Sequence, residues 1–438
     1  MKKLVSMAQL HVLLAGAVLA GGTAAQGAEA LTPAVDQRYL EQIAALRGDP
    51  TVQSALDHVL DIEPQSHRDL VELNEIPAPP FNEERRAARF AELLRESGLR
   101  DVTIDEVGNV IGRRPGTGGK RVIAYSAHLD TVFPEGTDVT VRFDGDRMYA
   151  PGIGDNSRGL VVVLGVLRAL EHAGIQTEAD LLFIGNVGEE GLGDLAGVKH
   201  LFRDGAKKID TLIAVDGGRT DRIVYGGVGS HRYRVTFKGP GGHSWGAFGT
   251  ANPHHALGRA IALFVERAPA VTSKGDKTSY NVGRIGGGTS INSVPFESWM
   301  EVDMRSGNQD KLDDIDAVLQ EAVQQALQEE NDARLIGDAL TVSVDRVGTR
   351  PAALGDPNSP LVQRAMAATK AFGIEPELRI SSTDANLPIS IGVPAVTMSR
   401  GGIGGDAHSP DEWWENVDGH LAMQIGILTL LAEAKLAN

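Results

Sequence analysis

Five segments of this sequence, far apart along the chain, each carry a side chain that can bind a metal ion. Three of them follow runs typical of buried strands, in RVIAYSAHLD, ADLLFIGNVGEE and DTLIAVDGG. The other two lie in glycine-rich stretches, in APGIGDNSRG and in GGIGGDAHSP, which comes soon after the apolar run PAVTMS. The residues concerned are His128, Asp155, Glu189, Glu190, Asp216 and His408.

Each of these residues also has an ordinary structural interpretation. A histidine after a strand is often only solvated, Asp155 could cap a helix, and Asp216 could belong to a turn. The two glutamates could be an acidic pair on the surface. In a wound sheet, however, ligands bind beyond the carboxyl ends of the strands. Because all five segments would meet at that one edge, the sequence predicts a shared metal site there.

The chain has no cysteine, so any metal ion must be held by histidine, aspartate and glutamate. These ligands suit hydrolytic Zn²⁺, for which Mn²⁺ or Co²⁺ can substitute. A carboxylate can bridge two ions about 3.5–4 Å apart, which together clamp an attacking hydroxide and a polarised carbonyl group. Of two adjacent glutamates, one can bind metal while its neighbour handles the proton of the metal-bound water. Asp130 is well placed to accept the other ring N–H of His128.

Alternating strands and helices would position this edge. From residue 120, short apolar runs alternate with helical stretches, which predicts a wound sheet with helices on both faces. Between residues 224 and 348 the order becomes β-α-β-β-α-β, which is typical of a ferredoxin-like domain. We therefore predict an α/β fold with a wound, mixed-sheet domain in two parts, 31–223 and 349–438, and an inserted ferredoxin-like α+β domain at 224–348.

The first 30 residues are typical of a signal peptide. Lys2 and Lys3 precede an apolar stretch, LHVLLAGAVLAGG, and small residues follow it. The stretch is short for a membrane span, although an uncleaved anchor or a buried helix is the alternative. We therefore expect an exported protein, periplasmic or secreted, with no membrane attachment after cleavage. The net charge of −16, without a basic cluster, argues against nucleic acid as a partner.

Six motifs carry a resemblance to a known superfamily. They are SAHLDTV, GIGDNSRG, GNVGEEGLGD, AVDGG, KGPGGHSWG and GDAHSPDEW, in this order. They look like the successive motifs of the co-catalytic zinc hydrolases that include carboxypeptidase G, peptidase T, aminoacylase and succinyl-diaminopimelate desuccinylase. The similarity runs from about residue 65 to the C-terminus. It implies that the domain at 224–348 is a lid or dimerisation domain, and that the chain forms a homodimer through it.

The resemblance also implies a role for each candidate ligand. Asp155 would bridge two zinc ions per chain. His128 and Asp216 would complete one metal site, and Glu190 and His408 would complete the other.

Three further residues receive catalytic roles from the same resemblance. Glu189 would be the general base and then the general acid, and Asp130 would orient His128. His243, in GGHS, matches a histidine that stabilises the tetrahedral oxyanion, typically across a dimer interface. Without the resemblance, His243 would be interpreted as an ordinary loop histidine beside glycines.

Substrate contacts are expected in two further regions. Asn292 and Arg305 resemble residues of lid segments that meet the polar or carboxylate end of a substrate. The alternative is a turn and a strand arginine held in a salt bridge. Ser382, Thr383 and Asp384, in SSTDANLP, resemble a loop that lines the pocket in related peptidases.

The leading hypothesis is an exported di-zinc metallopeptidase that cleaves amide bonds of small peptides through a metal-bound hydroxide. An N-acyl amino acid deacylase or a carboxypeptidase of the same fold is the alternative within enzymes. A non-catalytic exported binding protein is the alternative from another class, although every expected ligand position is filled. A serine hydrolase is disfavoured because VGSHR and GGHSW lack the Gly-X-Ser-X-Gly pattern.

Overall fold

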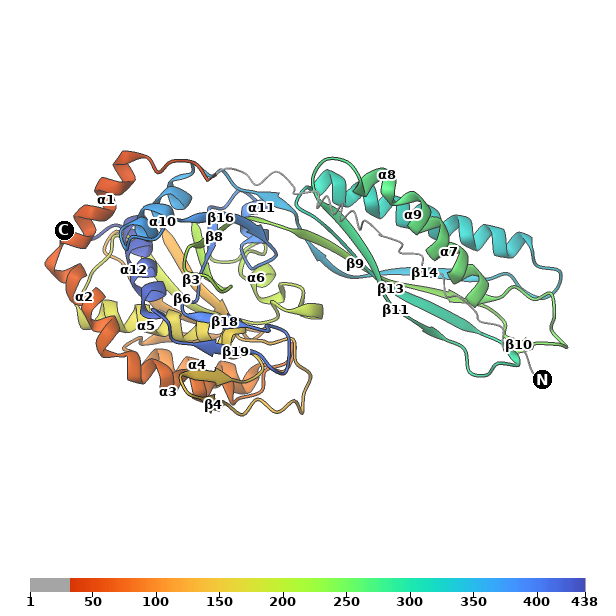
Figure 1. Ribbon diagram of the computed structural model, residues 1–438, viewed down its shortest axis with the longest axis horizontal. Coiled ribbons are helices and arrows are strands. Elements are labelled where there is room, and N and C mark those ends of the chain that lie inside the picture. Colours follow the sequence, from red (N-terminus) through yellow and green to blue (C-terminus); the bar gives the residue numbers. More distant parts are fainter. Residues whose placement is uncertain (1–31, 438) are drawn as a thin grey trace, which may run out of the picture. The chain divides into compact units, whose positions relative to one another are not determined.

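The computed structural model of this protein describes residues 32–437 (Figure 1). The predicted signal peptide, residues 1–30, lies outside the described residues. Between residues 32 and 437, no helix is both long enough and apolar enough to cross a membrane.

The largest sheet of the described chain has nine strands from both halves of the sequence. They are β1 (Asp101–Ile104), β2 (Val110–Arg114), β3 (Val122–His128), β6 (Asp180–Asn186), β7 (Thr211–Val215), β8 (Arg222–Gly227), β15 (Ala353–Leu354), β16 (Glu377–Ser381) and β17 (Ala395–Met398). Their order is β1-β2-β6-β3-β7-β17-β8-β15, with β16 paired to β8. The central strands β6, β3, β7 and β17 are parallel, and β2 and β8 flank them in antiparallel orientation. The segments after the parallel strands therefore leave the sheet at one edge.

Helices cover both faces of this sheet because its strands are apolar on both sides. Along β6, Leu181 and Phe183 belong to one hydrophobic core, whereas Leu182 and Ile184 belong to another. This alternation reflects the period of two residues in a strand. The larger core also holds residues of α4 (Glu84–Glu96), α5 (Gly159–His172), α10 (Pro360–Lys370) and α12 (His420–Ala434). The smaller core includes Leu201 of α6 (Ala196–Leu201), with Ile389 of α11 (Asn386–Ser390) packed against it.

Three helices come before α4 in the described chain: α1 (Gln37–Gly48), α2 (Pro50–Asp61) and α3 (Glu63–Asn74). The boundary between the first two follows from local chemistry. The side chain of Asp49 accepts the backbone N–H groups of Thr51 and Val52, and Pro50 occupies the first turn of α2, where its missing N–H has no consequence. Buried residues of these helices join the larger core.

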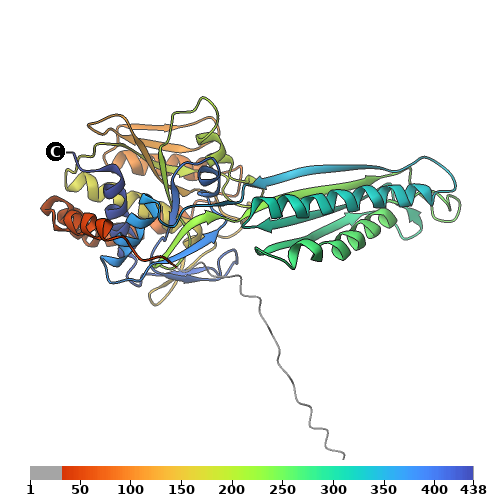
Figure 2. The ribbon, with the colours of Figure 1, turned by 90° about the horizontal axis from the view of Figure 1, so that it is seen from above.

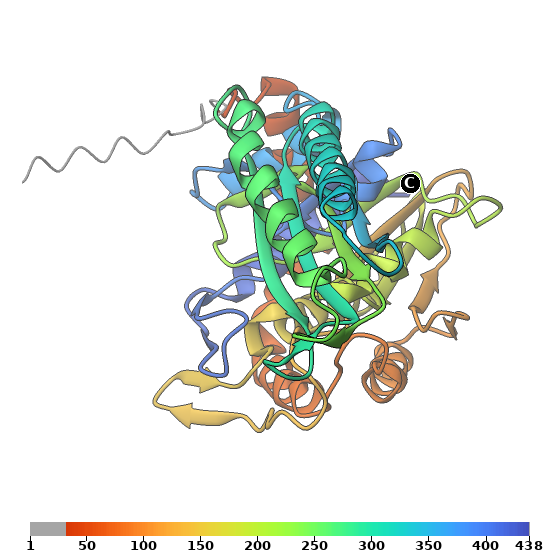
Figure 3. The ribbon, with the colours of Figure 1, turned by 90° about the vertical axis from the view of Figure 1, so that its right-hand side faces the viewer.

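A four-stranded antiparallel sheet lies between residues 229 and 350 of the described chain. Its elements are β9 (Gly229–Lys238), α7 (Pro253–Arg267), α8 (Pro269–Thr272), β11 (Thr278–Gly287), β13 (Glu297–Ser306), α9 (Gln309–Asp332) and β14 (Thr341–Arg350). The strand order is β11-β13-β9-β14. Helices α7 and α9 lie side by side on one face of this sheet (Figures 2 and 3), where they enclose a separate core. The strands β10 (Gly242–His243) and β12 (Ser293–Val294) pair with each other.

A second four-stranded sheet brings two distant hairpins together. It consists of β4 (Arg142–Asp144), β5 (Arg147–Tyr149), β18 (Ile403–Gly405) and β19 (Trp413–Glu415). The guanidinium of Arg147 lies over the ring of Trp413, and the buried Trp414 donates its indole N–H to the carbonyl of Gly401. This sheet fixes both ends of the loop that carries His408.

The structure confirms the predicted fold class. The wound sheet is mixed, and the β-α-β-β-α-β order occurs in the expected segment with ferredoxin-like strand order. The small sheet of β4, β5, β18 and β19 was not predicted, because its strands are short and pair across more than 250 residues. The domain boundaries at 223/224 and 348/349 stay a prediction.

Candidate metal centre

The parallel strands bring the predicted ligands to the same edge of the main sheet. His128 is the last residue of β3, Asp216 follows β7 directly, and the pair Glu189–Glu190 follows β6 after a turn. Asp155 lies in the turn Ile153–Arg158 that leads into α5, where its own backbone angles are not helical, and its peptide bond to Asn156 is cis. His408 comes from the loop between β18 and β19.

Within the described residues, three groups of side chains place ligand atoms within 4.8 Å of one another. His128, Asp155 and Asp216 form one group, and Asp155, Glu190 and His408 form another. Asp155 is common to both groups, and its two oxygens face different histidines. Oδ1 lies 3.2 Å from Nε2 of His128, and Oδ2 lies 3.3 Å from Nε2 of His408. This arrangement is the one expected of a carboxylate that bridges two cations.

The third group joins His128 and Glu190 to Glu189. Glu189 therefore lies beside both predicted metal positions without being needed to complete either one. Its side chain is buried, with 4 % of its surface exposed. A carboxylate in this place can reach a water molecule held between the two positions, which is the geometry required of a general base.

The donor set suits a cation. Nε2 of His128 and Oδ1 of Asp155 are buried and have no aligned hydrogen-bond partner among residues 32–437. Burial lowers the pKa of His128, but the carboxylates of Asp130 and Asp155 outweigh it, and the pKa lies well above its usual value. The carboxylates of Asp155 and Glu190 raise the pKa of His408 to about 10. Such a concentration of negative charge favours any positive charge placed among it.

The burial and mutual proximity of these groups also change the pKa values of the acidic side chains. Burial, reinforced by the nearby Asp155, raises the pKa of Asp216 above its usual value. Burial also raises the pKa of Glu189 well above its usual value, although the Arg350 guanidinium acts in the opposite direction. Divalent cations between these carboxylates would relieve the repulsion that adds to the effect of burial.

Asp130 supports the glutamate pair more directly than the sequence indicated. Its carboxylate accepts the backbone N–H of Glu189 at 2.9 Å and that of Glu190 at 2.7 Å. Nδ1 of His128 lies 3.1 Å from the backbone carbonyl oxygen of Asp130 and 3.5 Å from its carboxylate. The predicted contact between the ring of His128 and Asp130 therefore exists, with the backbone carbonyl as the nearer partner.

Glu412 holds the turn that presents Asp155, and sequence reasoning assigned it no role. Its carboxylate accepts the backbone N–H groups of Gly152, Gly154 and Asp155 at 2.8–3.0 Å. Burial, with the charge of Asp155, raises the pKa of Glu412 to about 7. Its position in the motif GDAHSPDEW was the available signal.

A glycine is required at position 152 in this turn. Its φ of +79° lies in the left-handed region, and a Cβ atom there would come within 2.6 Å of Cγ2 of Thr131. An L-residue would therefore meet both backbone strain and a steric clash.

Arg350 is the second residue that sequence reasoning missed. It ends β14, and its guanidinium donates to Oε1 of Glu189 at 2.8 Å and to the backbone carbonyl of the same residue. It also donates to Oγ of Ser382 at 2.9 Å. The sequence offered only an arginine at the end of a strand, before Pro351.

The inserted domain, predicted at 224–348 and called the lid below, carries three of the predicted site residues. Within residues 32–437, these three make no hydrogen bond or ion pair to the metal-ligand candidates. His243 is exposed on β10, and its Nδ1 accepts the backbone N–H of Trp245 at 3.2 Å. Because Nδ1 is an acceptor, the proton of the neutral ring is on Nε2. Asn292 is exposed beside it, and the Nε of Arg305 donates to Asp303 at 2.8 Å.

The predicted pocket loop is buried, and its side chains are largely occupied. Oγ1 of Thr383 hydrogen bonds to Oγ1 of Thr397 at 2.8 Å. Oδ2 of Asp384 accepts the amide N–H of Asn186 at 2.8 Å, at the carboxyl end of β6. Burial raises the pKa of Asp384 to about 6. Asp384 thus lies near the metal-ligand candidates, whereas the side chain of Thr383 stabilises the loop through its hydrogen bond to Thr397.

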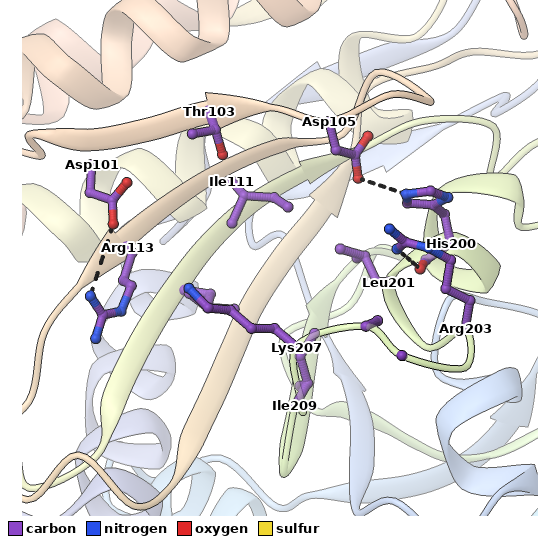
Figure 4. A pocket seen from close by; sticks show the side chains of 13 residues that line it. Asp101, Thr103, Asp105, Ile111, Arg113, His200, Leu201, Arg203, Lys207 and Ile209 are labelled. Atoms are coloured by element: carbon purple, nitrogen blue, oxygen red, sulfur yellow. Dashed lines mark hydrogen bonds and ion pairs between the residues drawn. The ribbon is translucent and has the colours of Figure 1, made fainter.

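A separate cavity of about 320 Å³ lies between the edge strand β1, its neighbour β2 and the segment after α6 (Figure 4). Apolar side chains, including Ile111 and Leu201, contribute to its lining, and charged groups including Arg113 and Lys207 border it. Metal-ligand candidates are not among its lining residues. The cavity is therefore separate from the candidate metal centre.

Fold and site together define a class: a wound α/β protein with a histidine–carboxylate cluster of possible metal ligands at the ends of its strands. A family model described as Peptidase family M20/M25/M40 matches residues 124–434. The chain belongs to this family.

Two relatives illustrate the similarity in sequence. Carboxypeptidase G2 of Pseudomonas sp. (strain RS-16) is 28 % identical over 272 residues, which are 60 % of this chain and 61 % of the relative. The cytosol non-specific dipeptidase of Escherichia coli (strain K12) is 25 % identical over 300 residues, which are 60 % of this chain and 59 % of the relative. The chain thus spans about three-fifths of the length of these relatives.

Solved structures show the same fold. The aminopeptidase PepT of Bacillus cereus superposes with a TM-score of 0.67 at 22 % identity, covering 84 % of this chain and 98 % of that chain. A tripeptidase of Staphylococcus aureus gives a TM-score of 0.69 at 21 % identity, covering 85 % of this chain and 99 % of that chain.

Proposed function

We propose that this protein is an exported metallopeptidase that binds two zinc ions and hydrolyses amide bonds of small peptides. The observation that carries the proposal is the position of Asp155, whose two carboxylate oxygens face different histidines, with Glu189 beside both groups. A single-metal or purely structural cluster would need neither the shared carboxylate nor an additional buried acid beside it.

Zinc bound at this cluster would supply Lewis acidity that polarises the substrate carbonyl group and acidifies water. Glu189 takes the proton of the attacking water as the new C–O bond forms. It then returns this proton to the amide nitrogen as the C–N bond breaks, which releases an amine and a carboxylic acid, and the acid loses its remaining proton to solvent. Glu189 is buried beside both groups of ligand candidates, a position from which one carboxyl group can both accept and donate the proton.

His243 is proposed to stabilise the oxyanion, and its tautomer supports this role. With Nδ1 accepting from Trp245, the exposed Nε2–H is free to donate to a developing negative charge. In the superfamily that the sequence resembles, such a histidine typically acts across a dimer interface, so we propose a homodimer formed through the four-stranded domain. Light scattering on the purified protein tests the oligomeric state, and a monomer at assay concentration would exclude the proposed homodimer.

The substrate proposal rests on several lines of support. The names of related proteins include a dipeptidase, a tripeptidase and an aminopeptidase, and the first 30 residues are typical of an exported protein. The similarity to carboxypeptidase G2 favours, as a second candidate, a carboxypeptidase or N-acyl amino acid deacylase built on the same site. Cell fractionation of the native protein tests the export proposal.

A metal analysis combined with a substrate panel tests the activity. The purified protein should hold about two zinc equivalents per chain, and a chelator should abolish cleavage. The panel should contain dipeptides, tripeptides and N-acyl amino acids, so that a response limited to the last class would favour the deacylase. Glu189→Gln should lose activity and keep its zinc, whereas Glu301→Gln, on the lid sheet, should behave as the wild type. Hydrolysis by Glu189→Gln at the wild-type rate would contradict the proposal.

A further inference from the structure

Arg350 connects a lid strand to the proposed general base. It is the last residue of β14, where it pairs with Ser230 of β9, and 4 % of its surface is exposed. One guanidinium nitrogen donates to Oε1 of Glu189 at 2.8 Å and to Oγ of Ser382 at 2.9 Å. The other donates to the backbone carbonyl of Glu189. Arg350 thus contacts both the side chain and the peptide group of Glu189.

The loop that follows Glu190 is attached to the same strands. Oδ2 of Asp194 accepts the backbone N–H of Thr349 at 2.8 Å, and Lys199 donates to the carbonyl oxygen of Thr349 at 2.9 Å. Arg232, on β9, donates to the carbonyl oxygen of Gly191 at 2.5 Å. The segment from Glu189 to Asp194 is therefore held against the ends of two lid strands.

The position of Glu189 needs such support because its surroundings are acidic. Glu190 and Asp384 lie near it and repel a carboxylate at this position, and Arg350 is the cation with the closest contact to it. A guanidinium with two points of attachment fixes an orientation as well as a distance. A general base must lie within hydrogen-bond reach of the proton that it takes, and a displacement of about 1 Å can lower a rate by roughly 100-fold.

We propose that Arg350 is a positioning residue that fixes Glu189 for catalysis and ties the base to lid strand β14. This inference rests on the proposed function, in which Glu189 is the general base. Arg350 acts through Glu189 and does not exchange protons with the substrate. Its substitution should therefore change the catalytic step more than the affinity for substrate or metal.

The test compares Arg350→Gln and Arg350→Lys with a matched control. Arg234→Gln removes an arginine of the neighbouring strand β9, which is paired with the carboxylate of Glu301 and lies away from Glu189. For each zinc-loaded variant, kcat, KM and zinc content are measured on the best substrate of the panel. Hydrogen–deuterium exchange of the 188–194 segment is measured alongside.

Arg350→Gln should lower kcat by roughly 10- to 100-fold while KM and zinc content stay within about threefold of the wild type. Its 188–194 segment should exchange faster. Arg350→Lys keeps the positive charge with a single point of attachment and should recover part of the lost kcat. Arg234→Gln should match the wild type.

Several results would overturn the inference. These are an unchanged kcat in Arg350→Gln, a loss of zinc parallel to the loss of kcat, and unchanged exchange of the 188–194 segment. If Arg350→Gln does not fold, Arg350→Lys decides, because full wild-type kcat in that variant would exclude a need for two attachment points. If the wild type cleaves no amide, the proposed function fails, and exchange in the variants still decides whether Arg350 orders the Glu189 segment.

Discussion

Oδ1 of Asp130 accepts the backbone N–H of Glu189 at 2.9 Å, so a residue after β3 fixes the segment after β6. The other oxygen of the same carboxylate accepts the N–H of Glu190 at 2.7 Å. Asp130 is fully buried and also lies beside His128. The carboxylate of Asp130 therefore contacts the ligand candidate His128 and holds the backbone of the proposed base, Glu189, and of Glu190.

Asp130→Ala should weaken zinc binding by about 10- to 100-fold, because residues that orient metal ligands typically contribute that much. It should also lower kcat, since both backbone N–H groups lose their acceptor. Asp130→Asn keeps one acceptor oxygen and should lie between Asp130→Ala and the wild type. Competition with a chromophoric chelator measures the affinity, with Asp345→Asn on β14 as the control. Zinc affinity of Asp130→Ala equal to that of the control would contradict this account.

His408→Gln should reduce the zinc content from about two equivalents per chain to about one. His408 belongs only to the group with Asp155 and Glu190, so the position formed by His128, Asp155 and Asp216 keeps its ligands. Asp155→Ala should reduce both occupancies, because Asp155 is shared. Elemental analysis after dialysis gives the stoichiometry, and His255→Gln, exposed on α7, is the control. Equal zinc contents in His408→Gln and Asp155→Ala would argue against the shared ligand.

Gly152→Ala should destabilise the fold by about 2–4 kcal/mol, from about 1 kcal/mol of left-handed strain and about 1–3 kcal/mol of overpacking. The matched control is Gly145→Ala, in the turn between β4 and β5. Gly145 also has a positive φ, +60°, but a Cβ atom there would meet nothing within 4 Å. Its substitution should cost only about 1 kcal/mol. Chemical denaturation of the zinc-free proteins measures both changes in the free energy of unfolding. Equal changes in the two variants would show that the contact with Thr131 adds no cost at position 152.

The contacts of Asp316, in the lid and away from the metal centre, predict that the stability of the fold depends on pH. Its carboxylate contacts Nδ1 of His231 at 2.9 Å, the hydroxyl of Tyr233 at 2.7 Å and the guanidinium of Arg346 at 2.8 Å. Burial raises the pKa of Asp316, but its hydrogen bonds with His231, Gln320 and Tyr233 outweigh burial and lower the pKa from 3.8 to about 2. A carboxyl group with a lowered pKa stabilises the fold above its unfolded value and loses that contribution as the pH falls through the folded value.

Asp316→Asn should therefore be less stable than the wild type at pH 6, and the difference in Tm should shrink as the pH falls from about 4 towards 2. Thermal unfolding of the chelated proteins across this range measures the difference. A gap in Tm that stays constant with pH would mean that ionisation of Asp316 contributes nothing. Asp313→Asn, on an exposed part of α9, serves as the control.

The sequence predicted the strand ends of the centre because local patterns mark them. His128 and Asp216 end apolar runs, and parallel pairing of those runs then brings the two residues together. Arg350 and Glu412 were missed because their partners lie 161 and about 260 residues away along the chain. Nothing in the local sequence distinguishes Arg350 from a surface charge, and the only local signal for Glu412 was its place in the motif GDAHSPDEW. Their partnerships follow from tertiary packing, which a single sequence does not encode in its spacing.

The same limit applies to the predicted substrate contacts. Asp384 is near the centre and bonded to Asn186, whereas His243, Asn292 and Arg305 contact their own domain. Motif resemblance names these residues, but it does not state which surface they face. The loop of Thr383 likewise resembles a pocket lining, yet its hydroxyl is engaged with Thr397.

Anomalous diffraction at the zinc absorption edge, from crystals grown with zinc, tests the two-metal centre most directly. The account predicts two peaks about 3.5–4 Å apart, one beside His128 and Asp216 and one beside Glu190 and His408, with Asp155 touching both. A single peak, or two peaks that do not share Asp155, would contradict it.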